Sequence, residues 1–171
     1  MLVFQTERLT VRRLTVADAP FMLAILNSEG FLNNIGDRGV TTVPQAEAYL
    51  IEGSLDSYQQ NEFGMYAVTL TSTGEAIGLA GLVKREQLSD VDIGYALLPQ
   101  YWRRGYAFEA AFGVVEHARA LGFSELLGIV SPGNQASIQL LEKLGFNFDK
   151  VLQWDEDDEV LLYHKALEII D

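Results

Sequence analysis

The chain has 171 residues, 49% of them hydrophobic, and 24 acidic side chains against 12 lysines and arginines give it a formal net charge of -12. This length and apolar content predict a single folded domain over residues 1–171. The acidic excess disfavours nucleic acid and anionic membranes as partners. The absence of cysteine excludes disulfides and thiolate metal sites. The N-terminus lacks the apolar run of a signal peptide, so we expect a cytoplasmic protein.

The first third of the sequence predicts one strand and two helices. Residues 9–14, LTVRRL, alternate apolar and polar side chains as a half-buried strand does. A helix is predicted over residues 16–29, with Gly30 past its end, and a second over residues 43–60. The intervening residues 31–42 contain two glycines and predict a mobile loop.

The rest of the sequence predicts a β-meander and then a strand-helix-strand unit. Residues 63–86 form two strand-like runs around the turn TSTGE, and residues 91–99, VDIGYALLP, form a third that Pro99 ends. A helix follows from near Gly105, with Phe108, Phe112 and Val115 on one side. We expect the remaining elements to be a strand at 126–130, a helix within 132–146, and strands near 148–154 and 160–167. This order predicts a mixed α/β fold.

The segment YWRRGYAFEA, residues 101–110, places Arg103 and Arg104 directly before Gly105 and the start of a helix. A helix N-terminus offers free backbone N–H groups and the positive end of the helix dipole, and a glycine lets an anion approach closely. The pattern therefore indicates a phosphate site. From these residues alone, a solvated turn is an equal alternative. The glycine patterns of P-loops and of dinucleotide-binding loops do not occur.

Three segments together resemble the GNAT N-acetyltransferases, in particular the branch of the ribosomal-protein N-terminal acetyltransferases. They are DIGYALLPQYWRRGYAFEA, TERLTVRRLTVADA and SPGNQASIQLLEKLGF, in the order and spacing of that family. The resemblance implies an acyl-CoA N-acyltransferase fold. Its central sheet would be mostly antiparallel, with splayed strands and flanking helices.

The resemblance also implies how acetyl-CoA would bind. The pyrophosphate would lie on backbone N–H groups of Arg103, Arg104, Gly105, Tyr106, Ala107 and Phe108. The pantetheine arm would run as an added strand along Ala96, Leu97 and Leu98. The sequence departs from the family pattern in having Trp102 at the first motif position, Arg103 where glycine is common and Phe108 where a small hydroxyl residue is common.

The resemblance implies that Ser137 would hydrogen-bond the thiolate of the leaving coenzyme A. Ser137 lies in an Asn-x-x-Ser pattern, whose Asn134 would contact the pantetheine arm or the acceptor. The tyrosine that many members use is absent, because Leu141 occupies its position. Considered without the resemblance, Asn134 is a favoured helix N-cap and Ser137 an ordinary first-turn serine. Both interpretations stay open.

Two acids are candidates for the general base that deprotonates the acceptor amine. Asp92 lies in a strand and would share a face with Ala96, while an edge acid facing water is the alternative. Glu156 lies in the acidic run DEDDE, which would hold a cationic amine or simply be a solvated loop. We expect no metal site.

The favoured hypothesis is an acetyl-CoA-dependent N-acetyltransferase that acts by direct attack in a ternary complex. Its acceptor would be a protein N-terminal α-amine or a small primary amine. The alternative is a GNAT-like acyl-CoA-binding or sensor module that has lost catalysis, and a scaffold or phosphate-binding protein unrelated to CoA is remote. A homodimer stays open.

Overall fold

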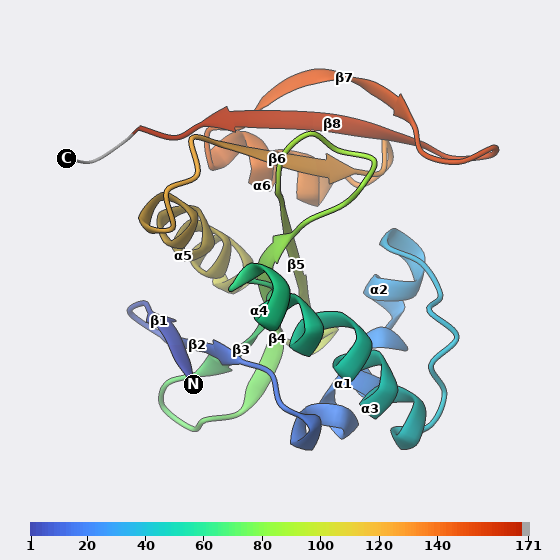
Figure 1. Ribbon diagram of the computed structural model, residues 1–171, viewed down its shortest axis with the longest axis vertical. Helices are drawn as coiled ribbons and strands as arrows, with labels where there is room; N and C mark the ends of the chain where they lie inside the picture. The colour runs from blue at the N-terminus through green and yellow to red at the C-terminus, as the bar shows by residue number, and fades with distance from the viewer. Residues whose placement is uncertain (169–171) are drawn as a thin grey trace.

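The computed structural model describes residues 1–168 and consists of a strongly bent sheet with helices on both faces (Figure 1). The sheet has eight strands in the order β1-β2-β3-β4-β5-β6-β8-β7. The strands are β1 (Leu2–Gln5), β2 (Leu9–Arg13), β3 (Met65–Leu70), β4 (Ala76–Val83), β5 (Asp92–Leu97), β6 (Glu125–Val130), β7 (Asn147–Gln153) and β8 (Glu159–Ala166). All neighbours are antiparallel except β5 and β6, which are parallel. The predicted mixed α/β fold with a mostly antiparallel sheet is confirmed.

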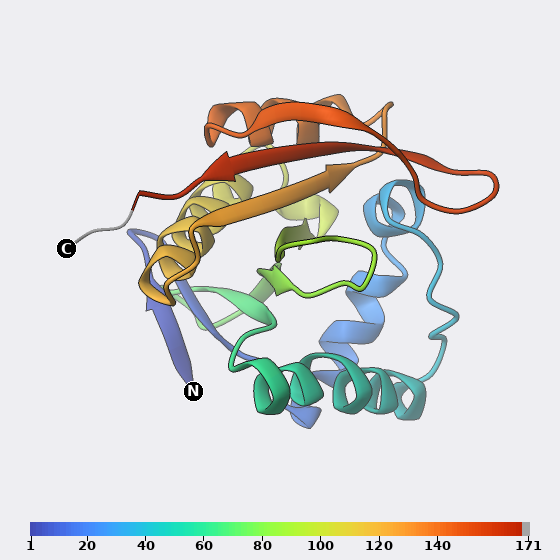
Figure 2. The same cartoon turned by 45° about the horizontal axis from the view of Figure 1, so that its top comes forward.

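The helices form two groups, one on each face of the sheet. They are α1 (Ala19–Leu26), α2 (Glu29–Asn34), α3 (Val43–Leu50), α4 (Asp56–Asn61), α5 (Tyr106–Ala120) and α6 (Gln135–Lys143). Alternate side chains of the strands point to opposite faces and so build two cores. One core joins the sheet to α5 and α6, and the other joins it to α1 and α3 (Figure 2). A π-helical turn, Ile51–Leu55, connects α3 to α4, so the helix predicted over residues 43–60 is continuous.

In the N-terminal third, one prediction is wrong and one strand was not predicted. Residues 31–42 are not wholly a loop, because α2 covers Glu29–Asn34 and buries Phe31 against the second core. The strand predicted over residues 9–14 is β2, but β1 precedes it and pairs with it as a hairpin. A helix as short as α2, with one buried residue, has no periodicity that a sequence pattern could reveal.

The predicted apolar stripe of α5 is also wrong in part. Val115 is buried as expected, but Phe112 is 51% exposed. The face that packs on the sheet is made of small residues instead, because the helix lies close to the strands there. A Cβ added at Gly113 would come within 2.2 Å of the ring of Phe4 on β1. A stripe of large side chains would not fit this approach.

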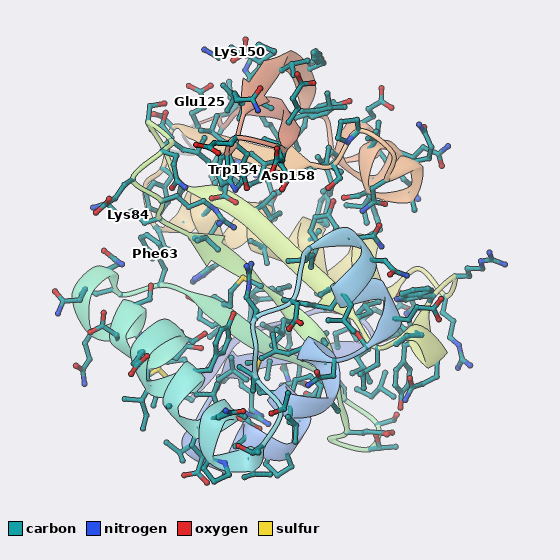
Figure 3. All side chains as sticks on the ribbon, turned by 90° about the vertical axis from the view of Figure 1, so that its right-hand side faces the viewer. Phe63, Lys84, Glu125, Lys150, Trp154 and Asp158 are labelled. Carbon is teal, nitrogen blue, oxygen red and sulfur yellow. The ribbon has the colours of Figure 1, made fainter. Side chains whose placement is uncertain are left out.

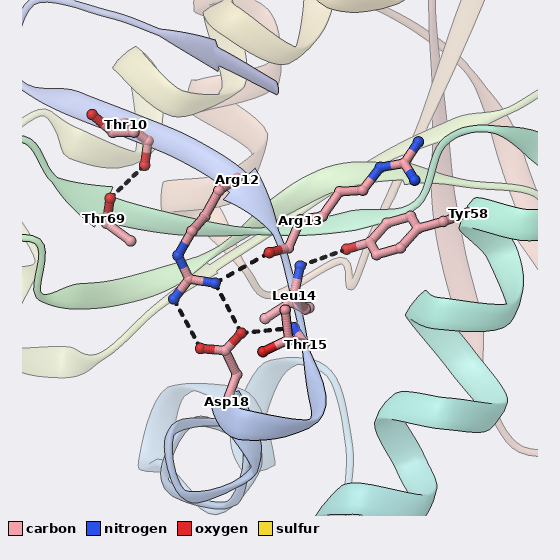
Figure 4. Close-up of polar contacts among 8 residues, drawn as sticks. All are labelled: Thr10, Arg12, Arg13, Leu14, Thr15, Asp18, Tyr58 and Thr69. Carbon is pink, nitrogen blue, oxygen red and sulfur yellow. Dashed lines mark hydrogen bonds and ion pairs between the residues drawn. The ribbon is translucent and has the colours of Figure 1, made fainter. Parts of the chain in front are cut away.

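The crossover from β2 to α1 is fixed by a partly buried polar cluster (Figure 4). The guanidinium of Arg12 donates to both carboxylate oxygens of Asp18, at 2.9 and 2.8 Å, and the Thr15 N–H donates to the same carboxylate at 2.8 Å. The Leu14 N–H donates to the Tyr58 hydroxyl at 3.0 Å, which ties α4 to the same crossover. Burial alone would raise the pKa of Asp18, but the bonds from Arg12 and Thr15 hold it below its usual value. These bonds fix the entry into α1 and join it to α4.

Candidate functional site

A gap opens between β5 and β6. Within residues 1–168 these strands are paired at a single position, Asp92 opposite Leu127, where the Leu127 N–H donates to the Val91 carbonyl at 3.0 Å. Beyond this point they diverge, as the prediction of splayed strands required. Residues of β5 after Asp92 therefore present a strand edge to the gap.

The register of β5 decides which backbone groups face the gap. Ala96 lies opposite Leu79 of β4, and the Leu98 N–H donates to the Ile77 carbonyl at 2.9 Å. Backbone polar groups of successive residues point to opposite sides of a strand. Those of Ala96 and Leu98 therefore point to β4, and those of Tyr95 and Leu97 point into the gap. Of the three residues predicted to line the pantetheine arm, Leu97 offers its backbone, and Tyr95 is a residue that sequence reasoning missed.

Trp102 and α2 lie at the outer end of the gap. The Trp102 indole donates from Nε1 to the Leu97 carbonyl at 3.0 Å, and its ring lies so close to α2 that a Cβ on Gly30 would approach it to 2.3 Å. At the other end of the same helix, the Asn34 carbonyl accepts from the Ser131 hydroxyl at 3.4 Å, just after β6. Helix α2 thus spans from the end of β5 to the end of β6.

The turn before α5 has two left-handed residues, Arg103 at φ 63° and Gly105 at φ 82°. A side chain strains this conformation, so glycine would suit the position of Arg103 better. The first backbone bond within α5 is donated by Glu109, to the Gly105 carbonyl at 3.1 Å. The N–H groups of Tyr106, Ala107 and Phe108 precede it and are those that a helix N-terminus offers to an anion.

Arg8 holds this turn from the β1–β2 hairpin. Its guanidinium donates to the Arg104 carbonyl at 2.9 Å and to Glu109 at 2.8 Å, and it lies 4.4 Å from the centre of the Tyr106 ring. Glu109 also accepts from the Arg8 N–H at 2.9 Å and from the Thr6 hydroxyl. Partial burial would raise the pKa of Glu109, but these bonds, first that from Thr6 and then those from Arg8, lower it. A shallow cavity of about 390 Å³ lies beside the turn, between the hairpin and the outer face of α5.

Asn134 and Ser137 lie at the start of α6. The Asn134 side chain accepts from the Ser137 N–H at 3.2 Å, so Asn134 is the N-cap of the helix as its position suggested. The Ser137 hydroxyl lies 2.7 Å from the Tyr95 hydroxyl across the gap. Leu141, at the position where the resemblance implied a tyrosine in many members, is 1% exposed and packs in the first core.

The interpretation of Asp92 as an edge acid facing water is wrong. Its side chain is 1% exposed, and one carboxylate oxygen lies 3.0 Å from Nε of Arg85. Burial raises the pKa of Asp92 to about 6, against the lowering effect of Arg85. The buried strand position follows from the alternation of β5, which places Asp92 and Ala96 on the face of the second core.

Arg85 links Asp92 to the acidic turn between β7 and β8. Its guanidinium lies 5.7 Å from the centre of the Trp154 ring, and the Trp154 N–H donates to the Asp158 carbonyl at 2.8 Å (Figure 3). The Asp155 carboxylate accepts from the N–H groups of Asp157 and Asp158, each at 2.9 Å, so the turn is closed by its own acid. Glu156 is exposed at the tip. Sequence reasoning identified the acids of this region but missed Arg85 and Trp154.

No group of three or more His, Asp or Glu side chains suited to holding a metal ion occurs among residues 1–168. Within the same range, none of the helices combines the length and the apolar character needed to cross a bilayer.

A sequence profile of the acetyltransferase (GNAT) domain matches residues 8–147. The chain therefore belongs to the GNAT acetyltransferase family, and the predicted assignment to the N-acetyltransferases is confirmed. It is similar to the uncharacterized N-acetyltransferase YoaA of Bacillus subtilis (strain 168), with 29% identity over 88% of this chain and 86% of YoaA. An acetyltransferase from Agrobacterium tumefaciens str. C58 has a similar structure, with a TM-score of 0.80 and 28% identity over 96% of this chain and 94% of that one. RimL, a ribosomal L7/L12 alpha-N-protein acetyltransferase solved in complex with coenzyme A, shares the fold with a TM-score of 0.84 at 15% identity over 98% of both chains.

Proposed function

We propose that this protein transfers the acetyl group of acetyl-CoA to a primary amine by direct attack in a ternary complex. The observation that carries the proposal is the free edge of β5, which leads to the first turn of α5. A pantetheine arm carries amides that can pair with a strand edge through Tyr95 and Leu97. A diphosphate is the anion that the N–H groups of Tyr106, Ala107 and Phe108 would bind, aided by Arg103 and Arg104.

The reaction needs three kinds of protein group. The amine nitrogen attacks the thioester carbonyl carbon, and a base takes the proton that the amine loses. The oxyanion that forms on the carbonyl oxygen would be stabilised by backbone N–H groups of the β5 edge. The carbon–sulfur bond then breaks, its electron pair leaves with the sulfur, and Ser137 would donate a hydrogen bond to the resulting thiolate.

Asp92 is the stronger candidate for the base. A pKa of about 6 leaves it mostly ionised at neutral pH yet basic enough to accept a proton. It also stands at the closed end of the gap, on the face of the sheet opposite to Ser137. Glu156 is exposed on the acidic turn, where the more natural role is attraction of a cationic amine. In this proposal, Asp92 deprotonates the acceptor amine and Glu156 attracts it to the site.

The acceptor would enter beside α2 and the acidic turn. Helix α2 contacts both Trp102 and Ser131 at the outer end of the gap, so its exposed residues Asn33 and Asn34 border the entrance. A protein N-terminal α-amine and a small primary amine both fit this chemistry. The shared fold with RimL supports a protein N-terminal α-amine as the acceptor. We also propose that the protein acts in the cytoplasm, where acetyl-CoA is available.

A catalytically weak acyl-CoA-binding module is the second candidate. It is favoured by one observation, the buried Leu141 on α6, which leaves that helix without a phenol hydroxyl at this position.

A mass-spectrometric screen with acetyl-CoA decides between the two candidates. The acceptors are peptides with free N-termini and a panel of small primary amines, and release of the CoA thiol is followed in parallel. The enzyme proposal predicts acetylated products that disappear with Ser137→Ala or Asp92→Asn while calorimetry still detects acetyl-CoA binding. Binding without any product across the panel favours the sensor, and no acetyl-CoA binding at high micromolar concentration refutes both.

A further inference from the structure

Tyr95 joins the two sides of the gap. Its backbone N–H and C=O face the gap from β5, while its hydroxyl lies 2.7 Å from Oγ of Ser137 on α6. The same hydroxyl lies 3.4 Å from the backbone carbonyl oxygen of Ser137. One residue therefore borders the predicted thioester path with its backbone and contacts the predicted thiolate partner with its side chain.

The local structure on both sides sets this contact. Alternation along β5 places Ile93, Tyr95 and Leu97 on the face that packs against α5 and α6. On α6, the Asn134 side chain already accepts the Ser137 N–H, so the cap of the helix is complete without the serine hydroxyl. That hydroxyl is free for another role, and it is held by Tyr95.

We propose that Tyr95 is a positioning residue for Ser137: its hydroxyl donates to Ser137 Oγ, which leaves the Ser137 proton directed at the sulfur of CoA. This inference rests on the proposed function of Ser137. No bond is made or broken beyond those of acetyl transfer. The electron pair of the carbon–sulfur bond stays on the sulfur, both hydroxyls keep their protons, and the amine proton goes to the base. Two hydrogen bonds in series stabilise the thiolate more than the serine hydroxyl alone.

The environment of Tyr95 keeps it a donor. Burial raises the pKa of its phenol to about 12, although the hydrogen bond with Ser137 lowers it. The hydroxyl therefore stays protonated through the neutral range, in which acetyl transfer would occur.

A purely structural bond between β5 and α6 would give different results. Its loss would weaken the binding of any CoA analogue equally, whether or not the analogue carries sulfur. The positioning role concerns the sulfur alone, so CoA and desulfo-CoA, which lacks the sulfur atom, separate the two.

The experiment is calorimetric titration of CoA and desulfo-CoA from neutral to alkaline pH, with no acceptor needed. In the wild type, the preference for CoA over desulfo-CoA should grow with pH as the bound thiol ionises. Tyr95→Phe should reduce the ratio of CoA affinity to desulfo-CoA affinity about tenfold and should bind desulfo-CoA as the wild type does. Ser137→Ala should lose at least as much, and the double variant no more than Ser137→Ala, because the two hydroxyls act as one unit.

Tyr66→Phe is the matched control, because it removes a buried hydroxyl that contacts Nε2 of His117 at 3.1 Å outside the gap. It should keep the full preference for CoA. The inference is overturned if Tyr95→Phe keeps the preference, if it loses desulfo-CoA binding as well, or if the losses in the double variant multiply. Failure of the wild type to bind both compounds would instead refute the proposed function itself.

Discussion

Asp92 and Ser137 lie on opposite faces of the sheet at the same gap. Asp92 stands at the one position where β5 and β6 pair, on the face of the second core, and Ser137 reaches Tyr95 from α6 on the other face. Such an arrangement separates the two proton-related tasks of acetyl transfer. The acceptor amine would be deprotonated on one side and the leaving sulfur stabilised on the other.

Replacing Asp92 with Asn should lower kcat by about a hundredfold or more, the usual contribution of a general base, without changing the affinity for acetyl-CoA. Because the pKa of Asp92 is about 6, the wild-type rate should rise with pH through that value and then level off. The measurement is kcat against pH with an acceptor from the screen. Glu156→Gln is the comparison: if it removes the rise near pH 6 and Asp92→Asn does not, the base is Glu156.

The stability of the wild type relative to Asp92→Asn should fall as pH rises, because of the raised pKa of Asp92. Burial raises its pKa in the folded protein from 3.8 to about 6, so the folded state binds more protons than the unfolded state between these values. Its contribution to stability is therefore complete below about pH 4 and is lost as pH rises through about 6. Urea unfolding at several pH values should show the unfolding free energy of the variant rising relative to that of the wild type by about 3 kcal/mol across this window. A constant difference between the two proteins would contradict the raised pKa.

Arg103→Gly should raise the free energy of unfolding by about 0.5–1 kcal/mol, because Arg103 has a φ of 63° that an L side chain strains and glycine does not. Arg104→Gly removes the same charge from a residue without a positive φ, and it should instead lower stability by a similar amount. Denaturant unfolding of the two variants is the check. Equal effects would mean that charge rather than backbone strain is being measured.

Glu109→Gln should loosen the turn before α5, because the carboxylate accepts from Thr6 and twice from Arg8. A loss of about 1–2 kcal/mol of unfolding free energy is expected at neutral pH. The lowered pKa of Glu109 means that its stabilisation is present above 4.5, its ordinary value, and is lost as pH falls through the folded-state pKa. The stabilities of variant and wild type should therefore converge in acid. A difference that persists there would contradict this account.

The sequence predicted the regular elements well because their patterns are local. The strand predicted within residues 91–99 is confirmed, and so is its end before Pro99, because β5 stops at Leu97. Local patterns did not reveal that the Tyr95 hydroxyl meets a serine 42 residues later in the chain. The contact of Arg8 with Glu109 joins residues 101 positions apart, so local patterns could not reveal it either.

Two errors had a different physical origin. One of the two interpretations of Asp92 placed it at a solvent-facing edge, because an unpaired buried carboxylate is unfavourable. Arg85, from the loop before β5, supplies the missing partner, and loops carry no periodicity that would place it. The stripe of α5 was misjudged at Phe112 because helix spacing gives the angle of a side chain but not the distance to the sheet.

Backbone hydrogen exchange of this 19.0 kDa protein, followed residue by residue by NMR with and without acetyl-CoA, tests the central claim most directly. Acetyl-CoA should slow exchange at the amides of Tyr95 and Leu97 and at those of Tyr106, Ala107 and Phe108. The Leu98 amide, already bonded to β4, should change little. Saturating acetyl-CoA that leaves both the β5 edge and the first turn of α5 exchanging at their original rates would contradict the account.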